Sequence, residues 1–221
     1  MAEAFEVPSC DKCRYPAIHH QVYSGRMMCG KHLSDSVQKK VSKAVRKQLV
    51  FPKGSHLTIL VAISGGKDSA VLLERMVSIL GKRRDVTIVG GCVDEGIDGY
   101  RPPSLECARQ LCADLGVEFE TVSYPELGFK EMDEVVSKME GLNDSKTPCS
   151  YCGVFRRQGI NHLAKRINAD VIALGHNLDD MAQTVLMNMQ NGDLERTLRL
   201  APHTNTPIAD MAPRIVPLRW V

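Results

Sequence analysis

Between residues 55 and 190, hydrophobic and polar residues follow two patterns, one typical of buried strands and one typical of helices. The two patterns alternate along the chain. Continuous apolar runs, typical of buried parallel strands, cover residues 57–63, 86–93, 117–122 and 170–174. Helical spacing of apolar residues covers 70–80, 104–115, 130–139, 154–167 and 179–189. Strands and helices that alternate with short connections predict an α/β fold with a doubly wound, mostly parallel sheet.

A different pattern precedes this region. Residues 1–33 are rich in Cys, His, Tyr and Gly and show neither rhythm. A helix follows, for which we expect Ser34 as the N-cap, because Val37, Val41, Val45 and Leu49 repeat every four residues with basic residues between them. Pro52-Lys53-Gly54 predicts a break. The expected organisation is a small knot (1–33), a basic linker helix (34–54) and one main domain (55–221).

Composition narrows the class of protein. The chain has 221 residues, of which 43% are hydrophobic and 24% charged, as in soluble globular proteins. We find no apolar run long enough for a membrane span and no signal peptide, so we expect a cytoplasmic protein without a membrane partner. Because Val221 follows Pro217-Leu218-Arg219-Trp220 without a cap or a tail, we expect the natural protein to be longer.

The net charge is +2, but basic residues occur in groups, at 39–47, 82–84, 156–157 and 165–166. Such groups can bind the phosphates of RNA, or they can simply be solvated surface.

Eight cysteines in a protein of the reducing cytoplasm indicate metal or redox chemistry rather than disulfides. The first group is Cys10-x₂-Cys13 followed by Cys29-x₂-His32, a Cys₃His pattern suited to tetrahedral zinc. A segment this short cannot bury a core, so zinc would supply its folding free energy. His19 and His20 are competing ligands.

The segment Ser64-Gly65-Gly66-Lys67-Asp68-Ser69 connects a predicted buried strand to a helix. Such a turn presents backbone N–H groups and a helix N-terminus to an anion, while the serine hydroxyls and the Lys67 ammonium add donors. Asp68 could hold Mg²⁺ or cap the helix. The alternative is a glycine-rich turn without a ligand.

A second pair, Cys149-x₂-Cys152, stands just before a predicted helix that carries Arg156 and Arg157. Thiols near a helix N-terminus and arginines have lowered pKa values and serve as metal ligands or sulfur nucleophiles, although a structural zinc half-site or inert thiols would show the same spacing. Asp179 and Asp180 follow another strand. Asp180 could bind Mg²⁺ or the substrate base there, or both residues could merely complement the helix dipole.

These motifs carry a resemblance. SGGKDS is the signature of the PP-loop ATP pyrophosphatases, which split ATP between the α- and β-phosphates. Together with VDEGIDGYR (93–101), PCSYCGVFRR (148–157) and GHNLDDMAQT (175–184), the chain resembles the tRNA 2-thiolation enzymes of the TtcA/TtuA family. The N-terminal knot resembles that of the TtuA and NcsA type, which favours uridine over cytidine as the target.

The resemblance implies roles for individual residues. The backbone of Ala62 and Val93 would contact adenosine, residues 64–69 would hold pyrophosphate with Mg²⁺, Arg156 and Gly175 would border ATP, and Asp180 would be a catalytic acid. Cys149 and Cys152 would hold an iron–sulfur cluster of the 4Fe-4S type with a third cysteine. No cysteine follows Cys152, so that ligand would lie beyond Val221; a persulfide relay between the two cysteines is the alternative.

The predicted activity is therefore a tRNA 2-thiouridine synthetase. ATP would adenylate the C2 oxygen of a uridine, at the wobble position, and sulfur would follow by way of the cluster. The resemblance leaves the sulfur donor open, as a thiocarboxylated ubiquitin-like protein or free sulfide, and makes a homodimer possible. The alternatives are thiolation of a T-loop uridine, a PP-loop amidating ligase, and a non-catalytic RNA-binding module with zinc and ATP.

Overall fold

The computed structural model describes residues 7–51, 54–139, 147–198 and 211–221. The described strands are β1 (His19–Gln21), β2 (Arg26–Met28), β3 (Leu57–Ala62), β4 (Val86–Asp94), β5 (Glu118–Ser123), β6 (Val171–Ala173) and β7 (Arg214–Ile215). The described helices are α1 (Gly30–Gln48), α2 (Lys67–Leu80), α3 (Arg101–Asp114), α4 (Met132–Met139), α5 (Pro148–Arg166), α6 (Leu178–Gln190) and α7 (Leu194–Leu198). None of these helices is long and apolar enough to cross a membrane.

The main sheet has five parallel strands in the order β5-β4-β3-β6-β7. The chain starts in the middle with β3, moves outward to β4 and β5, and then returns to the other side of β3 with β6 and β7. This reversal is a topological switch point, where the carboxyl ends of parallel strands leave a crevice for ligands. The predicted doubly wound α/β class is confirmed.

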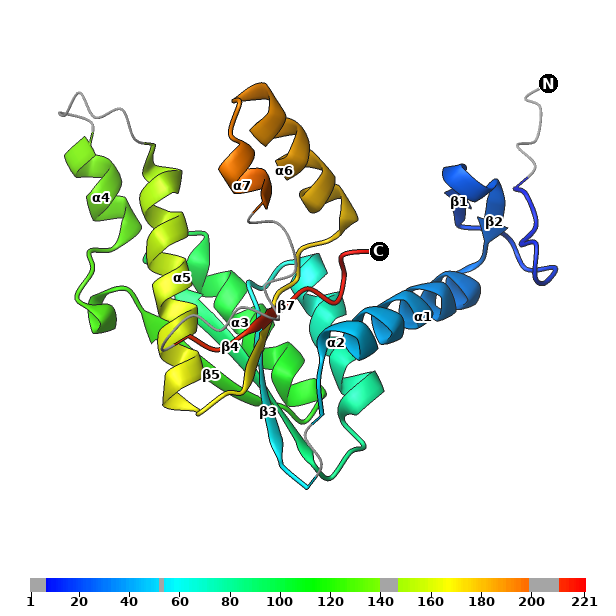
Figure 1. Cartoon of the computed structure of the whole chain (residues 1–221), viewed down its shortest axis with the longest axis horizontal. Coiled ribbons are helices and arrows are strands. Elements are labelled where there is room, and N and C mark those ends of the chain that lie inside the picture. The colour runs from blue at the N-terminus through cyan, green and yellow to red at the C-terminus, as the bar shows by residue number, and fades with distance from the viewer. Residues whose placement is uncertain (1–6, 52–53, 140–146, 199–210) are drawn as a thin grey trace.

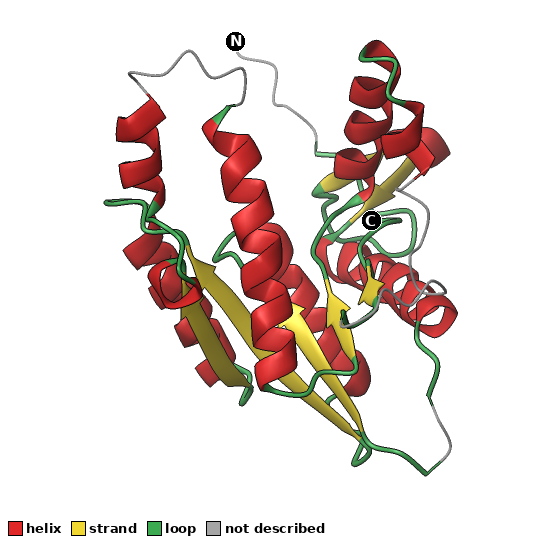
Figure 2. Cartoon of the chain, turned by 60° about the vertical axis from the view of Figure 1, so that its left-hand side comes forward, coloured by secondary structure: helices red, strands yellow, loops and turns green. Residues whose placement is uncertain are grey.

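Helices cover both faces of the sheet (Figure 2). Because side chains alternate along a strand, Ile59 and Val61 of β3 pack into one core with α1, α2 and α3. Leu60 points to the opposite face, where Leu163 of α5 and Met132 of α4 help to form a second core. Both faces are buried, which explains why the strands appear in the sequence as continuous apolar runs.

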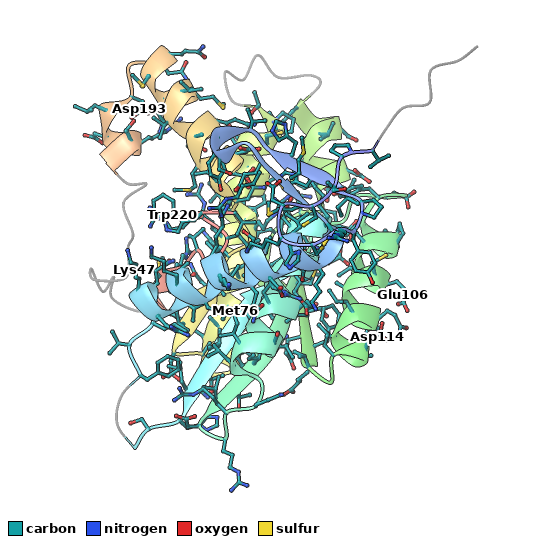
Figure 3. All side chains as sticks on the ribbon, turned by 90° about the vertical axis from the view of Figure 1, so that its right-hand side faces the viewer. Lys47, Met76, Glu106, Asp114, Asp193 and Trp220 are labelled. Atoms are coloured by element: carbon teal, nitrogen blue, oxygen red, sulfur yellow. The ribbon has the colours of Figure 1, made fainter. Side chains whose placement is uncertain are left out.

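The N-terminal region lies at one end of the molecule, and α1 connects it to the main domain (Figure 1). β1 and β2 form an antiparallel hairpin, although this segment showed no strand rhythm. α1 lies across α2 (Figure 3), with Val41 and Val45 buried between them and the sheet. The basic side chains of α1 point mostly to solvent, as their spacing predicted.

Several predicted boundaries were wrong by a few residues. α1 begins after Cys29 rather than after Ser34, so the first turn of the helix belongs to the cysteine-rich knot. α5 begins at Pro148 rather than at residue 154, so Cys149 and Cys152 lie inside the helix rather than before it. β7 was not predicted, because two residues are too few to show a rhythm. The break expected at Pro52-Lys53 lies outside the described residues.

Candidate functional site

A cavity of about 570 Å³ opens at the carboxyl ends of the central strands, at the switch point of the sheet. The residues that line it come from the ends of β3 and β4, the turns after β3, β4 and β6, the first residues of α2 and α3, the helix α5, and the strand β7. Among the residues predicted to bind ATP, those that line the cavity are Ala62, Ser64, Asp68, Ser69, Val93, Arg156 and Gly175. The fold thus gathers into one hollow residues that are scattered along the sequence.

The turn after β3 has the tight backbone that a phosphate loop requires. Gly65 has a φ of +84°, and a Cβ there would lie 2.3 Å from the carbonyl oxygen of Ser104, so only glycine fits. The Ser69 hydroxyl accepts from the backbone N–H of Ser64 at 3.2 Å and donates to the carbonyl of Gly66 at 2.8 Å. Directly after this turn α2 begins, with its N-terminus beside the cavity.

Lys67 and Asp68 are the first two residues of α2. Lys67 is largely exposed and lies 3.7 Å from the Asp68 carboxylate. Gly66, not Asp68, is the N-cap of α2, so Asp68 does not cap the helix. Asp68 lines the cavity instead and accepts from the side-chain amide of Asn177 at 3.4 Å. Its carboxylate is therefore available for the Mg²⁺ that the sequence predicted.

Asp180 has a structural role that explains its position. It is the third residue of α6, and its carboxylate accepts from the backbone N–H of Asn177 at 3.0 Å. The Asn177 side chain accepts in return from the Asp180 backbone N–H at 2.9 Å, which completes a capping box. Asp180 is exposed and does not line the cavity, so its role as a catalytic acid stays a prediction.

A buried ion pair beneath the cavity was not predicted. Arg101 Nε lies 2.7 Å from Oε2 of Glu95, and both side chains are less than 5% exposed. Arg101 also donates to the carbonyl of Ser64 at 3.1 Å and to the carbonyl of Val93. One guanidinium therefore ties the phosphate loop to the end of β4. The only signal in the sequence was that both charges lie in the motif VDEGIDGYR, directly after a buried strand.

Glu95 extends this contact toward the second cysteine pair. Its other oxygen, Oε1, accepts from Nε of Arg156 at 2.9 Å, and Nη2 of Arg156 lies 3.3 Å from the sulfur of Cys152. A continuous chain of polar contacts thus runs from Ser64 through Arg101, Glu95 and Arg156 to Cys152. These contacts connect the turn after β3 to the thiol of Cys152.

Cys149 and Cys152 lie near the N-terminus of α5, about one turn apart, so both thiols point to the same side of the helix. Cys149 is exposed and Cys152 is half-buried. The Tyr124 hydroxyl lies 3.4 Å from the Cys152 sulfur, and burial together with this contact raises the pKa of Tyr124 well above its usual range. Neither thiol lines the cavity, but Gly153 and Arg156, which follow them in the helix, do.

The N-terminal residues predicted to bind zinc come together. The ligand atoms of Cys10, Cys13, Cys29 and His32 all lie within 4.8 Å of one another. Cys13 and Cys29 sulfurs are 3.6 Å apart, and His32 Nδ1 lies 3.2–3.5 Å from the three sulfurs. With Zn–S bonds of about 2.3 Å and a Zn–N bond of about 2.0 Å, the edges of a zinc tetrahedron measure about 3.5–3.8 Å, which these distances match closely.

The competing ligands do not join this group. His19 and His20 are exposed on β1 and are absent from the cluster. Burial raises the pKa of the Cys10 thiol, but backbone hydrogen bonds involving Cys29 and Lys12 outweigh it and lower the pKa to about 6. Thiolate is the form that binds a metal, so these contacts prepare Cys10 as a ligand.

Residues 33–211 match the family model of the PP-loop domain. The chain belongs to the PP-loop family. The chain is 36% identical to the tRNA 2-thiolation protein NcsA of Haloferax volcanii, over 96% of this chain and 68% of that protein. It is 35% identical to the cytoplasmic tRNA 2-thiolation protein 1 of Anopheles gambiae, over 97% of this chain and 61% of that protein.

A solved structure agrees with these relatives. The U34-tRNA thiolase NcsA from Methanococcus maripaludis, solved with its [4Fe-4S] cluster, superposes with a TM-score of 0.82 at 30% identity. The alignment covers 96% of this chain and 68% of that one. The chain thus spans about three fifths to two thirds of the length of the relatives it matches. Its predicted membership among the tRNA 2-thiolation proteins of the PP-loop family is confirmed.

Proposed function

We propose that the protein is an ATP-dependent tRNA sulfurtransferase that replaces the C2 oxygen of a uridine with sulfur, and that the target is the wobble uridine, U34. The observation that carries the proposal is the position of a thiol pair one helical turn from a cavity that contains a PP-loop. Adenylation of a base and delivery of sulfur to the same carbon need both groups beside one substrate, and α5 provides that proximity.

ATP lies in the cavity with its phosphates at the turn 64–69 and its adenosine against the backbone of Ala62 and Val93. Gly65 and Gly66 let the backbone approach the phosphates, and the hydroxyls of Ser64 and Ser69 and the Lys67 ammonium donate to them. Asp68 binds Mg²⁺ beside the pyrophosphate. Gly175 borders the same loop, since a Cβ built on it would be in van der Waals contact with Ser69 at 3.4 Å.

The reaction has two steps. The uridine O2 attacks the α-phosphorus, the bond from that phosphorus to the bridging oxygen breaks, and pyrophosphate leaves. Sulfur then attacks C2 of the adenylated base, the C2–O bond breaks, and AMP leaves with the former uridine oxygen. The adenylate turns a poor leaving group into a good one. Arg156, held by Glu95 between the cavity and Cys152, donates to the phosphate oxygens on which negative charge develops.

Cys149 and Cys152 fit two of the positions around an iron–sulfur cluster, because two thiols one helical turn apart can ligate the same group and one of them is exposed. When bound, such a cluster would supply an iron that holds the sulfur atom. The other three cysteines outside the knot, Cys92, Cys107 and Cys112, lie on β4 and α3. A persulfide relay between Cys149 and Cys152 is the alternative route.

The remaining assignments complete the proposal. Zinc in the knot is structural, and residues 1–33 form a unit that the helix region 34–54 joins to the PP-loop domain at 55–221. The partners are tRNA and a sulfur donor, either a thiocarboxylated ubiquitin-like protein or sulfide. The protein acts in the cytoplasm and can form a homodimer.

The test is 2-thiouridine formation by anaerobically reconstituted protein with ATP, Mg²⁺, sulfide and tRNA. Mass spectrometry of the digested tRNA should place the sulfur at position 34, and omission of ATP should abolish the product. Sulfur in the T-loop instead would overturn the position. AMP formation from ATP and ammonia without any thiolated RNA would overturn the reaction in favour of a ligase.

A further inference from the structure

Four arginines line the cavity, and they fall into two groups. Arg101 and Arg156 both face the carboxylate of Glu95. Arg157 and Arg214 also line the cavity, but neither has a carboxylate partner in the described part of the chain. Two carboxylates line the cavity, but Glu95 pairs with Arg101 and Arg156, and Asp68 lies beside Lys67 and Asn177. One side of the cavity therefore carries positive charge without a matching negative charge.

Both of these arginines are held in place by neutral acceptors. Arg157 is exposed on α5, and its Nε donates to the carbonyl of Gly153 at 2.9 Å. Arg214 is half-buried on β7, and its Nη2 donates to Oδ1 of Asn161 at 2.9 Å. These single bonds orient the guanidinium groups but leave their charge uncompensated.

The two charges act on each other. Burial and the charge of Arg157 lower the pKa of Arg214. Like charges at a partly desolvated wall raise the free energy of the protein, and a bound anion relieves that cost. A guanidinium group can donate two parallel hydrogen bonds to the oxygens of one phosphate. Arginine is therefore a preferred residue for phosphate recognition. The arrangement thus suits a phosphate.

The position of the pair indicates which phosphate. The turn 64–69 already provides backbone N–H groups and hydroxyls for the polyphosphate of ATP. Arg157 instead lies on α5, the helix that has Cys149 and Cys152 near its N-terminus. The reacting uridine must lie between the PP-loop and these thiols, so its own backbone passes along the same helix.

We propose that Arg157 and Arg214 form a phosphate-binding subsite for the phosphodiester next to the target uridine of the RNA. The assignment rests on the proposed function for the identity of the RNA. The subsite holds the nucleotide by its backbone, so that an unstacked base can reach into the cavity. It contributes no base specificity, because phosphate contacts position a nucleic acid without reading its sequence.

The test measures tRNA and ATP affinity separately for Arg157→Gln, Arg214→Gln and the double variant, at several salt concentrations. Each single change should weaken tRNA binding about 5- to 20-fold and reduce the slope of log K against log salt by about 1, since one phosphate contact is lost. The dissociation constant for ATP should change less than about twofold, as expected when no contact to it is removed. Arg214→Lys, which keeps the charge, should retain part of the affinity.

Arg109→Gln is the matched control. Arg109 lies on α3, outside the cavity, and its side chain is 61% exposed. The control should leave tRNA affinity within about twofold of the wild type, because it removes an arginine without removing the proposed contact. Arg157→Gln alters an exposed side chain, so a circular dichroism spectrum identical to that of the wild type is expected.

Two results would overturn the subsite. If ATP affinity falls as much as tRNA affinity, the arginines serve the nucleotide; if neither falls, there is no phosphate contact. The proposed function fails in a different way: wild-type protein would make no 2-thiouridine while the arginine variants still bound tRNA more weakly and with a smaller salt slope. The binding readout does not depend on the chemistry, so the two failures are distinguishable.

Discussion

The chain contains the spacing Cys-x-x-Cys twice, and the two copies have opposite surroundings. In the knot, Cys10 and Cys13 meet Cys29 and His32 from the start of α1, and the four ligand atoms close around one point. In α5, Cys149 and Cys152 stand in a single turn of helix, with Cys149 exposed and Cys152 beside Tyr124 and Arg156.

This difference separates a closed group of four ligand atoms from an open pair of thiols. Four protein ligands saturate a tetrahedral ion and leave no position for a substrate. Two thiols at a helix end leave positions open, and polar contacts connect them to a nucleotide cavity. The spacing alone predicts that each cysteine pair binds a ligand. The side chains around each pair decide whether that ligand stabilises the fold or takes part in chemistry.

The largest effect is expected in the knot. Cys13→Ser removes one of four ligands, and metal binding of the kind that is worth about 10–16 kcal/mol in structural zinc sites should be mostly lost. Zinc content, measured by mass spectrometry, should fall, and residues 7–29 should become sensitive to protease. ATP binding should persist, because no residue of the knot lines the cavity. Full retention of zinc by this variant would contradict the assignment of the four ligands.

The thiols of α5 should behave in the opposite way. Cys149→Ala and Cys152→Ala should each lower 2-thiouridine formation at least about 1000-fold, or about 4 kcal/mol in the barrier, since each removes a group that handles the sulfur. Unfolding of Cys149→Ala should change by less than about 0.5 kcal/mol, as for other surface substitutions. Cys107→Ala, an exposed cysteine on α3, is the control and should keep full activity. Equal loss in the control would mean that the effect is not specific to the thiols of α5.

Glu95→Gln tests the link between the nucleotide loop and Cys152. Removing one charge of a buried pair should lower the free energy of unfolding by about 3 kcal/mol, because Arg101 is left buried without its counter-ion. We expect thiolation to fall at the same time, through misplacement of Arg156. Glu106→Gln is the matched control on the outer face of α3 (Figure 3), where an exposed pair with Arg109 is worth less than about 1 kcal/mol. Unchanged stability in Glu95→Gln would contradict a structural role for the pair.

The smallest effect concerns the cysteines that belong to neither pair. Burial raises the pKa of both Cys92 and Cys112 to about 11, so at pH 8 they should resist alkylation while Cys107 and Cys149 react. Knot thiols should react only after zinc is chelated. Because the folded protein holds these two protons more tightly than the unfolded chain, the free energy of unfolding should fall as pH rises from about 8.5 towards 11. Rapid labelling of Cys92 at pH 8 would contradict its burial.

The accuracy of the sequence analysis depended on how local each feature is. The PP-loop was predictable because a buried strand, a glycine turn and a helix are adjacent in the chain. The convergence of Cys10, Cys13, Cys29 and His32 was predictable from two short spacings. Glu95 and Arg101 were missed as a pair, since nothing in their spacing shows that both side chains are buried and facing each other. Arg214 was missed as well, because β7 is too short to leave a pattern.

The sequence by itself determined the class of fold, the phosphate turn and which Cys and His side chains of the knot come together, because these depend on side-chain rhythm and on spacings of a few residues. Only the tertiary structure decided which of two identical spacings is closed and which is open. It also brought Arg157 and Arg214 to one wall of the cavity, and it joined Ser64 to Cys152 through three charged side chains. Such contacts depend on the order of strands in the sheet, and strand order is set by packing both faces of the sheet at once.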